Sequence, residues 1–241
     1  MSTFLKFSKL VESFEHLEKT SSRNGIIKIL ENLFKKATEA NIDVICYFAL
    51  GNIVAGYKNI KMGMGDQMIK TSIAFAANLD KEDIEEKMQE FGDLGDVAFN
   101  VIGKKQKKFE KFFEIKDQPR VIDVHKGLMK IAETHGSNSV EIKEKILAAL
   151  LSNVTPKERR YMVRMVAGEM RLGIGDMTVL DSLASAFLGS KNKRKSLEHA
   201  YNVCSDIGHV AKILVKSGLK GIKQITIALN RPLRPMLAQR V

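Results

Sequence analysis

Residues 155–167 read Thr-Pro-Lys-Glu-Arg-Arg-Tyr-Met-Val-Arg-Met-Val-Ala and carry the clearest helix signal in the chain. Thr155 is suited to cap a helix, Pro156 to its first position, and Glu158 to complete a capping box. The apolar residues that follow return at three- and four-residue steps, which is the spacing of one helix face. The stretch predicts an amphipathic helix that starts at Thr155.

The same three- and four-residue spacing extends outward through most of the chain. It recurs in the N-terminal region at Phe4, Phe7, Leu10, Val11, Phe14 and Leu17. It returns over residues 26–37, and residues 44–54 are apolar nearly all round, which is typical of a helix buried on most faces. No segment of four to eight residues alternates like a half-buried strand. The sequence therefore predicts an all-α fold.

Composition narrows the class of protein. The chain has 241 residues, of which 39 are Lys or Arg and 28 are Asp or Glu, so its net charge is +11. Two cysteines, Cys46 and Cys204, are too few for a disulfide framework and suit a reducing cytoplasm. No apolar run reaches the ~18 residues of a membrane span, and Lys6, Lys9 and Glu12 do not fit a secretory signal. We expect a cytoplasmic protein with an anionic partner and no membrane partner.

An internal repeat is the most informative feature of the sequence. Residues 61–66, Lys-Met-Gly-Met-Gly-Asp, align with residues 171–176, Arg-Leu-Gly-Ile-Gly-Asp. Some thirty residues after each copy, Asp-Leu-Gly-Asp-Val-Ala at 93–98 aligns with Asp-Ile-Gly-His-Val-Ala at 206–211. Two motifs in the same order predict two pseudo-symmetric helical halves, although a period of 110 is too long for a solenoid.

The halves cover approximately residues 40–110 and 150–220, and each contains a Gly-x-Gly-Asp turn before a helix. Glycine lets a backbone approach a ligand closely, and free N–H groups at a helix start favour phosphate. The alternative is a tight interhelical turn with a capping aspartate. Because both copies carry a cation before the glycines, we expect each turn to bind one backbone of duplex DNA. The residues expected to do so are Lys61, Gly63, Gly65, Arg171, Gly173 and Gly175.

A row of cations leads into the second turn. If one helix continues through this region, Lys157, Arg160, Arg164 and Arg171 share a face, and the apolar residues occupy another. Such a row is often only a solvated face. Since no acidic residue of the same face interrupts it, the pattern predicts that Arg160 and Arg164 also contact DNA.

At this point the chain resembles a known family, the N-terminal DNA-binding domain of archaeal and eukaryotic ATP-dependent DNA ligases. The resemblance is carried, in the family's order, by KMGMGD (61–66), GDLGDVA (92–98), IAET (131–134), GEMRLG (168–173), SDIGHVA (205–211) and RPLRPMLA (231–238). It implies one large helical domain over residues 1–228 that binds duplex DNA around a nick. It also implies a linker over residues 229–241 that leads toward an adenylation domain.

The resemblance further implies a role in DNA replication, repair and recombination, with ATP and Mg²⁺ as cofactors of the full-length enzyme. The family's catalytic lysine lies in a Lys-x-Asp-Gly motif, and this sequence contains none. We therefore expect no catalytic residue and no cofactor in this chain, which alone should be inactive.

Residues 104–113 read Lys-Lys-Gln-Lys-Lys-Phe-Glu-Lys-Phe-Phe. The spacing of Gln106, Phe109, Phe112 and Phe113 resembles the sliding-clamp-binding motif of replication proteins, and archaeal ligases carry a related motif in this region. The resemblance implies an exposed recognition segment for a clamp of the proliferating cell nuclear antigen type. The alternative is that the three phenylalanines pack into the domain's own core.

Other features support weaker hypotheses. His199, Cys204 and His209 are five residues apart, which does not fit a helical metal site, so no metal is expected. The basic residues 191–195 suit a solvated linker and an auxiliary phosphate contact equally well. A non-enzymatic helical adaptor for a clamp is the main competing function. A sequence-specific regulator is disfavoured because no compact helix-turn-helix signature is present.

Overall fold

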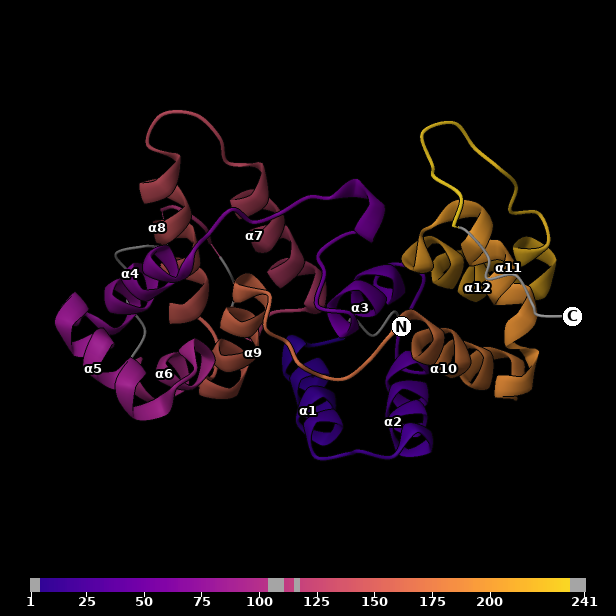
Figure 1. Ribbon diagram of the computed structural model, residues 1–241, viewed down its shortest axis with the longest axis horizontal. Helices are drawn as coiled ribbons and strands as arrows, with labels where there is room; N and C mark the ends of the chain where they lie inside the picture. The colour runs from indigo at the N-terminus through magenta and orange to yellow at the C-terminus, as the bar shows by residue number, and fades with distance from the viewer. Residues whose placement is uncertain (1–4, 104–110, 115–117, 235–241) are drawn as a thin grey trace, which may run out of the picture. The chain divides into compact units, whose positions relative to one another are not determined.

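The computed structural model describes residues 5–103, 111–114 and 118–234. These residues form α-helices and two short 3₁₀ helices and no strand, which confirms the all-α prediction (Figure 1). The α-helices are α1 (Phe7–Glu18), α2 (Arg23–Phe34), α3 (Ile42–Ala49), α4 (Asp66–Ala77), α5 (Lys81–Phe91), α6 (Leu94–Val101), α7 (Val121–Glu133), α8 (Ser139–Ser152), α9 (Pro156–Ala167), α10 (Asp176–Leu188), α11 (Arg194–Cys204) and α12 (Ile207–Ile222). The 3₁₀ helices are η1 (Gly56–Lys58) and η3 (Lys191–Lys193).

Helix α9 starts as its sequence predicts. Thr155 is the N-cap, its side chain accepts a hydrogen bond from the Glu158 N–H, and the Glu158 carboxylate accepts the Thr155 N–H at 2.8 Å. The helix ends at Gly168, whose φ of +75° is the left-handed conformation in which helices commonly terminate. Arg171 therefore lies beyond α9, so the condition under which it would share a helix face with Lys157, Arg160 and Arg164 is not met.

The predicted apolar faces form the core. Phe7, Leu10, Val11, Phe14 and Leu17 on α1 are all essentially inaccessible to solvent. Helix α3 is buried on most sides, as its nearly continuous apolar sequence predicts. Phe4 lies outside the described residues.

The chain forms two compact units, each assembled from separate stretches of sequence. Unit 1 contains residues 13–59 and the chain from 171 onward, and unit 2 contains residues 6–12 and 60–170. In unit 1, α10 packs on α2 and α12 packs on α3. In unit 2, α4 packs on α8 and α6 packs on α9.

These pairings show that the two repeats are interleaved. By order along the chain and by packing, α2 and α3 correspond to α8 and α9, and α4–α6 correspond to α10–α12. Helices α2 and α3 come directly before α4–α6 in the sequence but pack on α10 and α12 instead. Each unit therefore combines the front of one repeat with the back of the other.

The second repeated motif has one structural role in both units. Asp93 caps α6 by accepting the Asp96 N–H at 2.9 Å, and Asp206 caps α12 by accepting the His209 N–H at 2.9 Å. The glycine two residues after each cap permits close helix packing. A Cβ at Gly95 would lie 2.7 Å from the Arg160 carbonyl oxygen of α9, and one at Gly208 would lie 2.4 Å from the ring of Tyr47 of α3.

Candidate nucleic-acid interface

In unit 2, the first Gly-x-Gly-Asp turn lies at the start of α4. Gly63 has a φ of +60°, which only glycine adopts readily, and Gly65 is the N-cap of α4 in an extended conformation. Lys61 is exposed before the turn, and Asp66 is exposed at the first helical position.

In unit 1, the second turn repeats this geometry at the start of α10. Gly173 has a φ of +65°, Gly175 is the extended N-cap, and Arg171 is exposed before them. Both turns thus place a cation, a left-handed glycine and a glycine cap in the same order. In each unit, the structure brings the three predicted turn residues together.

Neither backbone conformation nor packing within the protein requires glycine at the two helix caps, Gly65 and Gly175. Gly65 and Gly175 have φ values of −85° and −110°, which other residues adopt without strain. A Cβ at either position would meet nothing within 4 Å. Aspartate or serine would also cap better, because a glycine has no side chain to accept the helix N–H groups. Glycine here leaves the helix start open to close approach by a ligand.

The first turn is stabilised by a buried lysine that sequence reasoning missed. Lys143 of α8 is only 7% exposed, and its Nζ donates a hydrogen bond to the Met62 carbonyl at 2.7 Å. Burial lowers the pKa of this lysine. The spacing of the apolar residues in α8 gives no signal for this contact, because its partner lies 81 positions away.

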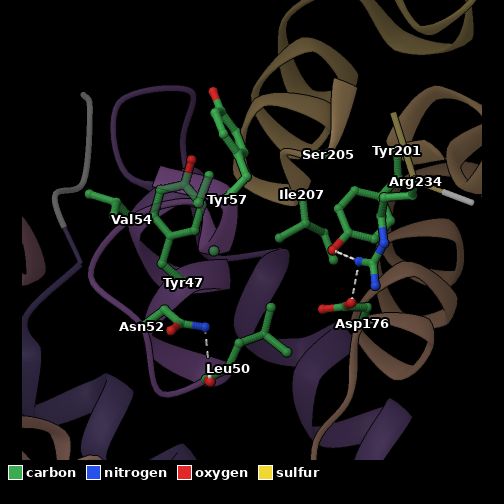
Figure 2. Close-up of a pocket in the computed structure, with 12 residues that line it drawn as sticks. Tyr47, Leu50, Asn52, Val54, Tyr57, Asp176, Tyr201, Ser205, Ile207 and Arg234 are labelled. Atoms are coloured by element: carbon green, nitrogen blue, oxygen red, sulfur yellow. Dashed lines mark hydrogen bonds and ion pairs between the residues drawn. The ribbon is translucent and has the colours of Figure 1, made fainter. Parts of the chain in front are cut away.

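The second turn is held differently, by the segment that follows α12. The Arg234 guanidinium donates to the carboxylate of Asp176 and to the hydroxyl of Tyr201, and lies 4.6 Å from the centre of the Tyr201 ring (Figure 2). The Ser205 hydroxyl donates to the Pro232 carbonyl at 2.6 Å and the Arg234 N–H to the Asn202 carbonyl at 2.9 Å. The Asp176 carboxylate raises the pKa of Arg234, so this guanidinium stays charged.

A hollow of about 360 Å³ lies beside this second turn, within unit 1. Asp176, Tyr201 and Arg234 form one side, and Tyr47 and Tyr57 form the other (Figure 2). The Tyr47 hydroxyl donates to the Asp206 carboxylate at 2.7 Å. Burial and this carboxylate raise the pKa of Tyr47, so it remains neutral. The hollow therefore has aromatic walls and one fixed ion pair.

Two arginines of the predicted cationic row, Arg160 and Arg164, pair with acidic residues at the start of α6. Arg164 pairs with Asp93 at 3.1 Å and with Asp96 at 3.2 Å, and its side chain is only 16% exposed. Arg160 pairs with Asp96 at 2.6 Å and stacks 4.4 Å from the ring centre of Phe99. Both arginines thus join α9 to α6, and their contact with DNA stays a prediction. The α9 sequence has no acidic residue on this face, but the fold supplies acidic partners from some 70 positions earlier in the chain.

A neighbouring arginine on α9 is a structural residue that the sequence did not indicate. Arg159 is 5% exposed and donates to the carbonyls of Leu151, Ile102 and Gly103. Burial lowers the pKa of this guanidinium. These contacts satisfy main-chain acceptors at the ends of α6 and α8 rather than an external ligand.

Two of the four predicted clamp-binding residues are described, and both are half-buried. The Phe112 carbonyl accepts a hydrogen bond from Lys130 Nζ of α7 at 2.7 Å, and that Nζ lies 5.7 Å from the ring centre of Phe113. Lys145 of α8 lies 5.1 Å from the ring centre of Phe112. Both rings are less exposed than the predicted recognition segment requires, because they rest against α7 and α8, and their clamp binding stays a prediction. Gln106 and Phe109 lie outside the described residues.

Metal-binding clusters and membrane-spanning helices are both absent from the described ranges. No group of three or more His, Cys, Asp or Glu side chains is placed there to hold a metal ion. None of the described helices has the length and apolar character to cross a bilayer.

Comparison with known proteins identifies the family. Residues 6–184 match the family model described as DNA ligase N terminus. The chain is 37% identical over 237 residues to "DNA ligase 2" of Korarchaeum cryptofilum, covering 98% of this chain and 39% of that protein. It is 37% identical over 238 residues to "Probable DNA ligase" of Aquifex aeolicus and 36% identical over 245 residues to "DNA ligase" of Staphylothermus marinus, again over 98% of this chain and 40% and 41% of those proteins. The chain thus spans about two-fifths of the length of these relatives, and it belongs to the DNA ligase N-terminus family.

Proposed function

We propose that this chain binds nicked duplex DNA, without reading its sequence, as the N-terminal part of a cytoplasmic ATP-dependent DNA ligase. The ligase would act in DNA replication, repair and recombination. The observation that carries the proposal is the pair of glycine caps at Gly65 and Gly175, which neither backbone conformation nor packing requires. Its family and the net charge of +11 support the same function.

Each turn offers the chemistry that a phosphate group needs. The first N–H groups of α4 and α10 point toward the turn that precedes each helix, and the helix dipole adds partial positive charge there. Lys61 and Arg171 supply a full charge beside each turn. Contacts to phosphates position a protein on DNA without specifying bases. The two turns would therefore grip the backbone and leave joining to the rest of the ligase.

We assign ATP and Mg²⁺ to the part of the ligase that corresponds to the remaining three-fifths of the relatives, because this sequence contains no Lys-x-Asp-Gly motif. The chain's own contribution is to hold the two DNA ends in line, which raises the effective concentration of the reacting groups.

The sharpest test replaces the two cap glycines by serine, as Gly65→Ser and Gly175→Ser together. Serine is the better helix cap, so the melting temperature should stay the same or rise. Its side chain would nevertheless stand between the helix start and a phosphate, so affinity for a nicked duplex should fall at least tenfold. Fluorescence anisotropy over a salt series measures the affinity. Gly103→Ser is the control, because Gly103 also has open space around it and lies outside both turns.

Two results would count against the proposal. Unchanged affinity in the double variant would make the turns structural only. A wild-type chain that is folded but does not bind duplex DNA would favour the adaptor function instead.

We also propose that Phe112 and Phe113 bind a sliding clamp. The observation that favours this is their position: neither ring is fully buried, Phe112 lies against Lys145 of α8, and Phe113 lies against Lys130 and Gly127 of α7. Rings held in this way are released at lower cost than core rings. Aromatic anchors that enter a pocket typically contribute about 2 kcal/mol or more each to binding.

The double variant Phe112→Ala and Phe113→Ala tests this second proposal. Clamp binding, measured by titration, should be abolished, while affinity for free nicked DNA stays within about twofold. The melting temperature should fall by only a few degrees. Retained clamp binding would remove the proposal, and a collapsed melting temperature would assign both rings to the core.

A further inference from the structure

A second hollow in unit 1 is lined mainly by cations. It has a volume of about 300 Å³ and lies where the start of α2, the middle of α10 and the start of α11 meet. Its lining residues are Arg23, Asp181, Lys191, Asn192, Arg194 and Lys195. Four of these six side chains carry a positive charge. The basic segment 191–195, for which the sequence leaves two interpretations open, forms one wall.

A buried carboxylate holds the two arginines in place. Asp181 is 5% exposed, and its two oxygens accept one hydrogen bond from Arg23 at 2.8 Å and one from Arg194 at 3.0 Å. Arg194 also pairs with Glu198 at 3.1 Å. A guanidinium has five N–H donors, so these bonds leave donors of both arginines for a ligand. The Arg23 side chain is 62% exposed, which places its remaining donors in reach of solvent.

The lysines add charge that the carboxylates do not balance. Lys191 donates to the Asn24 side chain, a neutral partner, at 2.9 Å. Lys195 is exposed. Four cations face Asp181 and Glu198, so the hollow has an excess positive charge. Two guanidinium groups held in place beside two lysines suit a phosphate ligand, which carries more charge and more acceptor oxygens than a carboxylate ligand.

The corresponding stretch in unit 2, residues 80–83, has three acidic residues and one lysine. Helix α5, which corresponds to α11, is capped by Asp80 and Asp83 and carries Glu82 in its first turn. Thr71 of α4 aligns with Asp181, and its hydroxyl donates to the Gln67 carbonyl of its own helix. Unit 2 therefore folds without a basic cluster at this place. The packing of the helices thus does not explain why unit 1 has one.

We propose that this hollow binds a backbone phosphate of duplex DNA, in addition to the phosphate bound at the Gly173 turn. The inference rests on the proposed DNA-binding function. The two places lie along one helix: the Gly173 turn comes directly before α10, and Asp181 lies five residues after Asp176, the first residue of α10. Five residues of helix span about 8 Å, or roughly two base pairs at about 3.4 Å each. Unit 1 thus offers two neighbouring phosphate contacts.

The test neutralises the two exposed lysines with the double variant Lys191→Gln and Lys195→Gln. Asp181 and both arginines remain, so the fold is kept. The matched control is Lys81→Gln and Lys87→Gln on α5, which removes the same charge from the corresponding helix of unit 2. Anisotropy with a nicked duplex of about 30 base pairs, over a salt series, measures both affinity and salt dependence.

The Lys191→Gln and Lys195→Gln variant should bind roughly tenfold more weakly at 0.1 M salt, and its log–log salt slope should be shallower by about 0.9 for each phosphate that the protein no longer neutralises. In the control variant, the change should stay within about twofold. An equal weakening in the control would show a general charge effect and overturn the inference. Unchanged binding of the Lys191→Gln and Lys195→Gln variant would also overturn it. A wild-type chain that does not bind DNA would instead overturn the proposed function.

Discussion

The two units hold an equivalent capping aspartate in place with different side chains. In each, an aspartate caps the last helix of a repeat and must be held against the helix packed beside it. In unit 2, Arg164 holds Asp93 through an ion pair, and Asp96 extends the network. In unit 1, the hydroxyl of Tyr47 holds Asp206 through a single hydrogen bond. Both units use an aspartate to cap the helix, but the side chain that holds this aspartate is charged in unit 2 and neutral in unit 1.

The turns before α4 and α10 show the same division. Lys143 stabilises the first from within a helix, whereas Arg234 stabilises the second from the segment after α12. A repeated motif therefore indicates which backbone geometry is kept. It does not indicate which side chains secure that geometry.

Arg164→Ala should have the largest effect on this comparison. It leaves Asp93 and Asp96 partly buried without one of their cationic partners, and breaking such a pair typically costs about 3–5 kcal/mol. The free energy of unfolding, measured with denaturant, should fall by that amount. Affinity for nicked DNA, measured well below the melting temperature, should change little. Full stability combined with weaker DNA binding would return Arg164 to the interface.

Gly95→Ala and Gly208→Ala test the close packing that the units share. The added methyl group would overlap the Arg160 carbonyl in unit 2 and the Tyr47 ring in unit 1. Overpacking of this kind typically costs about 1–3 kcal/mol, and both variants should lose stability in that range in thermal unfolding. Gly65→Ser, which meets open space, is the control. If Gly95 and Gly208 tolerate alanine as well as Gly65 tolerates serine, the second motif has another purpose.

Tyr47→Phe should cost less, about 1.5 kcal/mol, the lower end for a hydrogen bond to a charged group. Asp206 keeps the His209 N–H after this change, which limits the destabilisation. Urea unfolding of Tyr47→Phe beside Tyr57→Phe, a tyrosine on the same side of the hollow, isolates the contribution of the hydrogen bond. If Tyr47→Phe destabilises the protein as much as Arg164→Ala does, the Tyr47–Asp206 hydrogen bond contributes as much as the Arg164–Asp93 ion pair.

Glu31→Gln should give the smallest effect, no more than about 1 kcal/mol at pH 7, because the lysine partners of Glu31 are exposed. Hydrogen bonds from Lys35 and Ser185 lower the pKa of Glu31 from 4.5 to about 2. A carboxylate with a lowered folded pKa stabilises the protein above its unfolded pKa, and this stability is lost as pH falls through the folded value. The difference between wild type and Glu31→Gln should therefore shrink between pH 4.5 and pH 2. A difference independent of pH would exclude this ionic contribution.

Local features of the fold follow from the sequence because their causes are local. The Thr155–Glu158 capping box and the apolar face of α1 need only neighbouring residues, and both are present as predicted. Gly168 is also a helix-stop signal in the sequence, but assigning Arg171 to the same face as the other cations ignores it. The pairing of Arg164 with Asp93 spans 71 positions and depends on which helices pack together. Periodicity contains no information about that choice, so the ion pairs of the arginines on α9 could not be predicted from the sequence.

The interleaved order of the helices has a consequence for synthesis on the ribosome. Helices α2 and α3 emerge early, yet the helices that cover them, α10 and α12, emerge more than 120 residues later. Unit 2 is nearly contiguous, so it has its complete set of helices by residue 170. Until the last third of the chain is made, the apolar surface of α3 has no native cover and is open to aggregation or to a chaperone. The earliest-made part of unit 1 is therefore the last to reach its final packing.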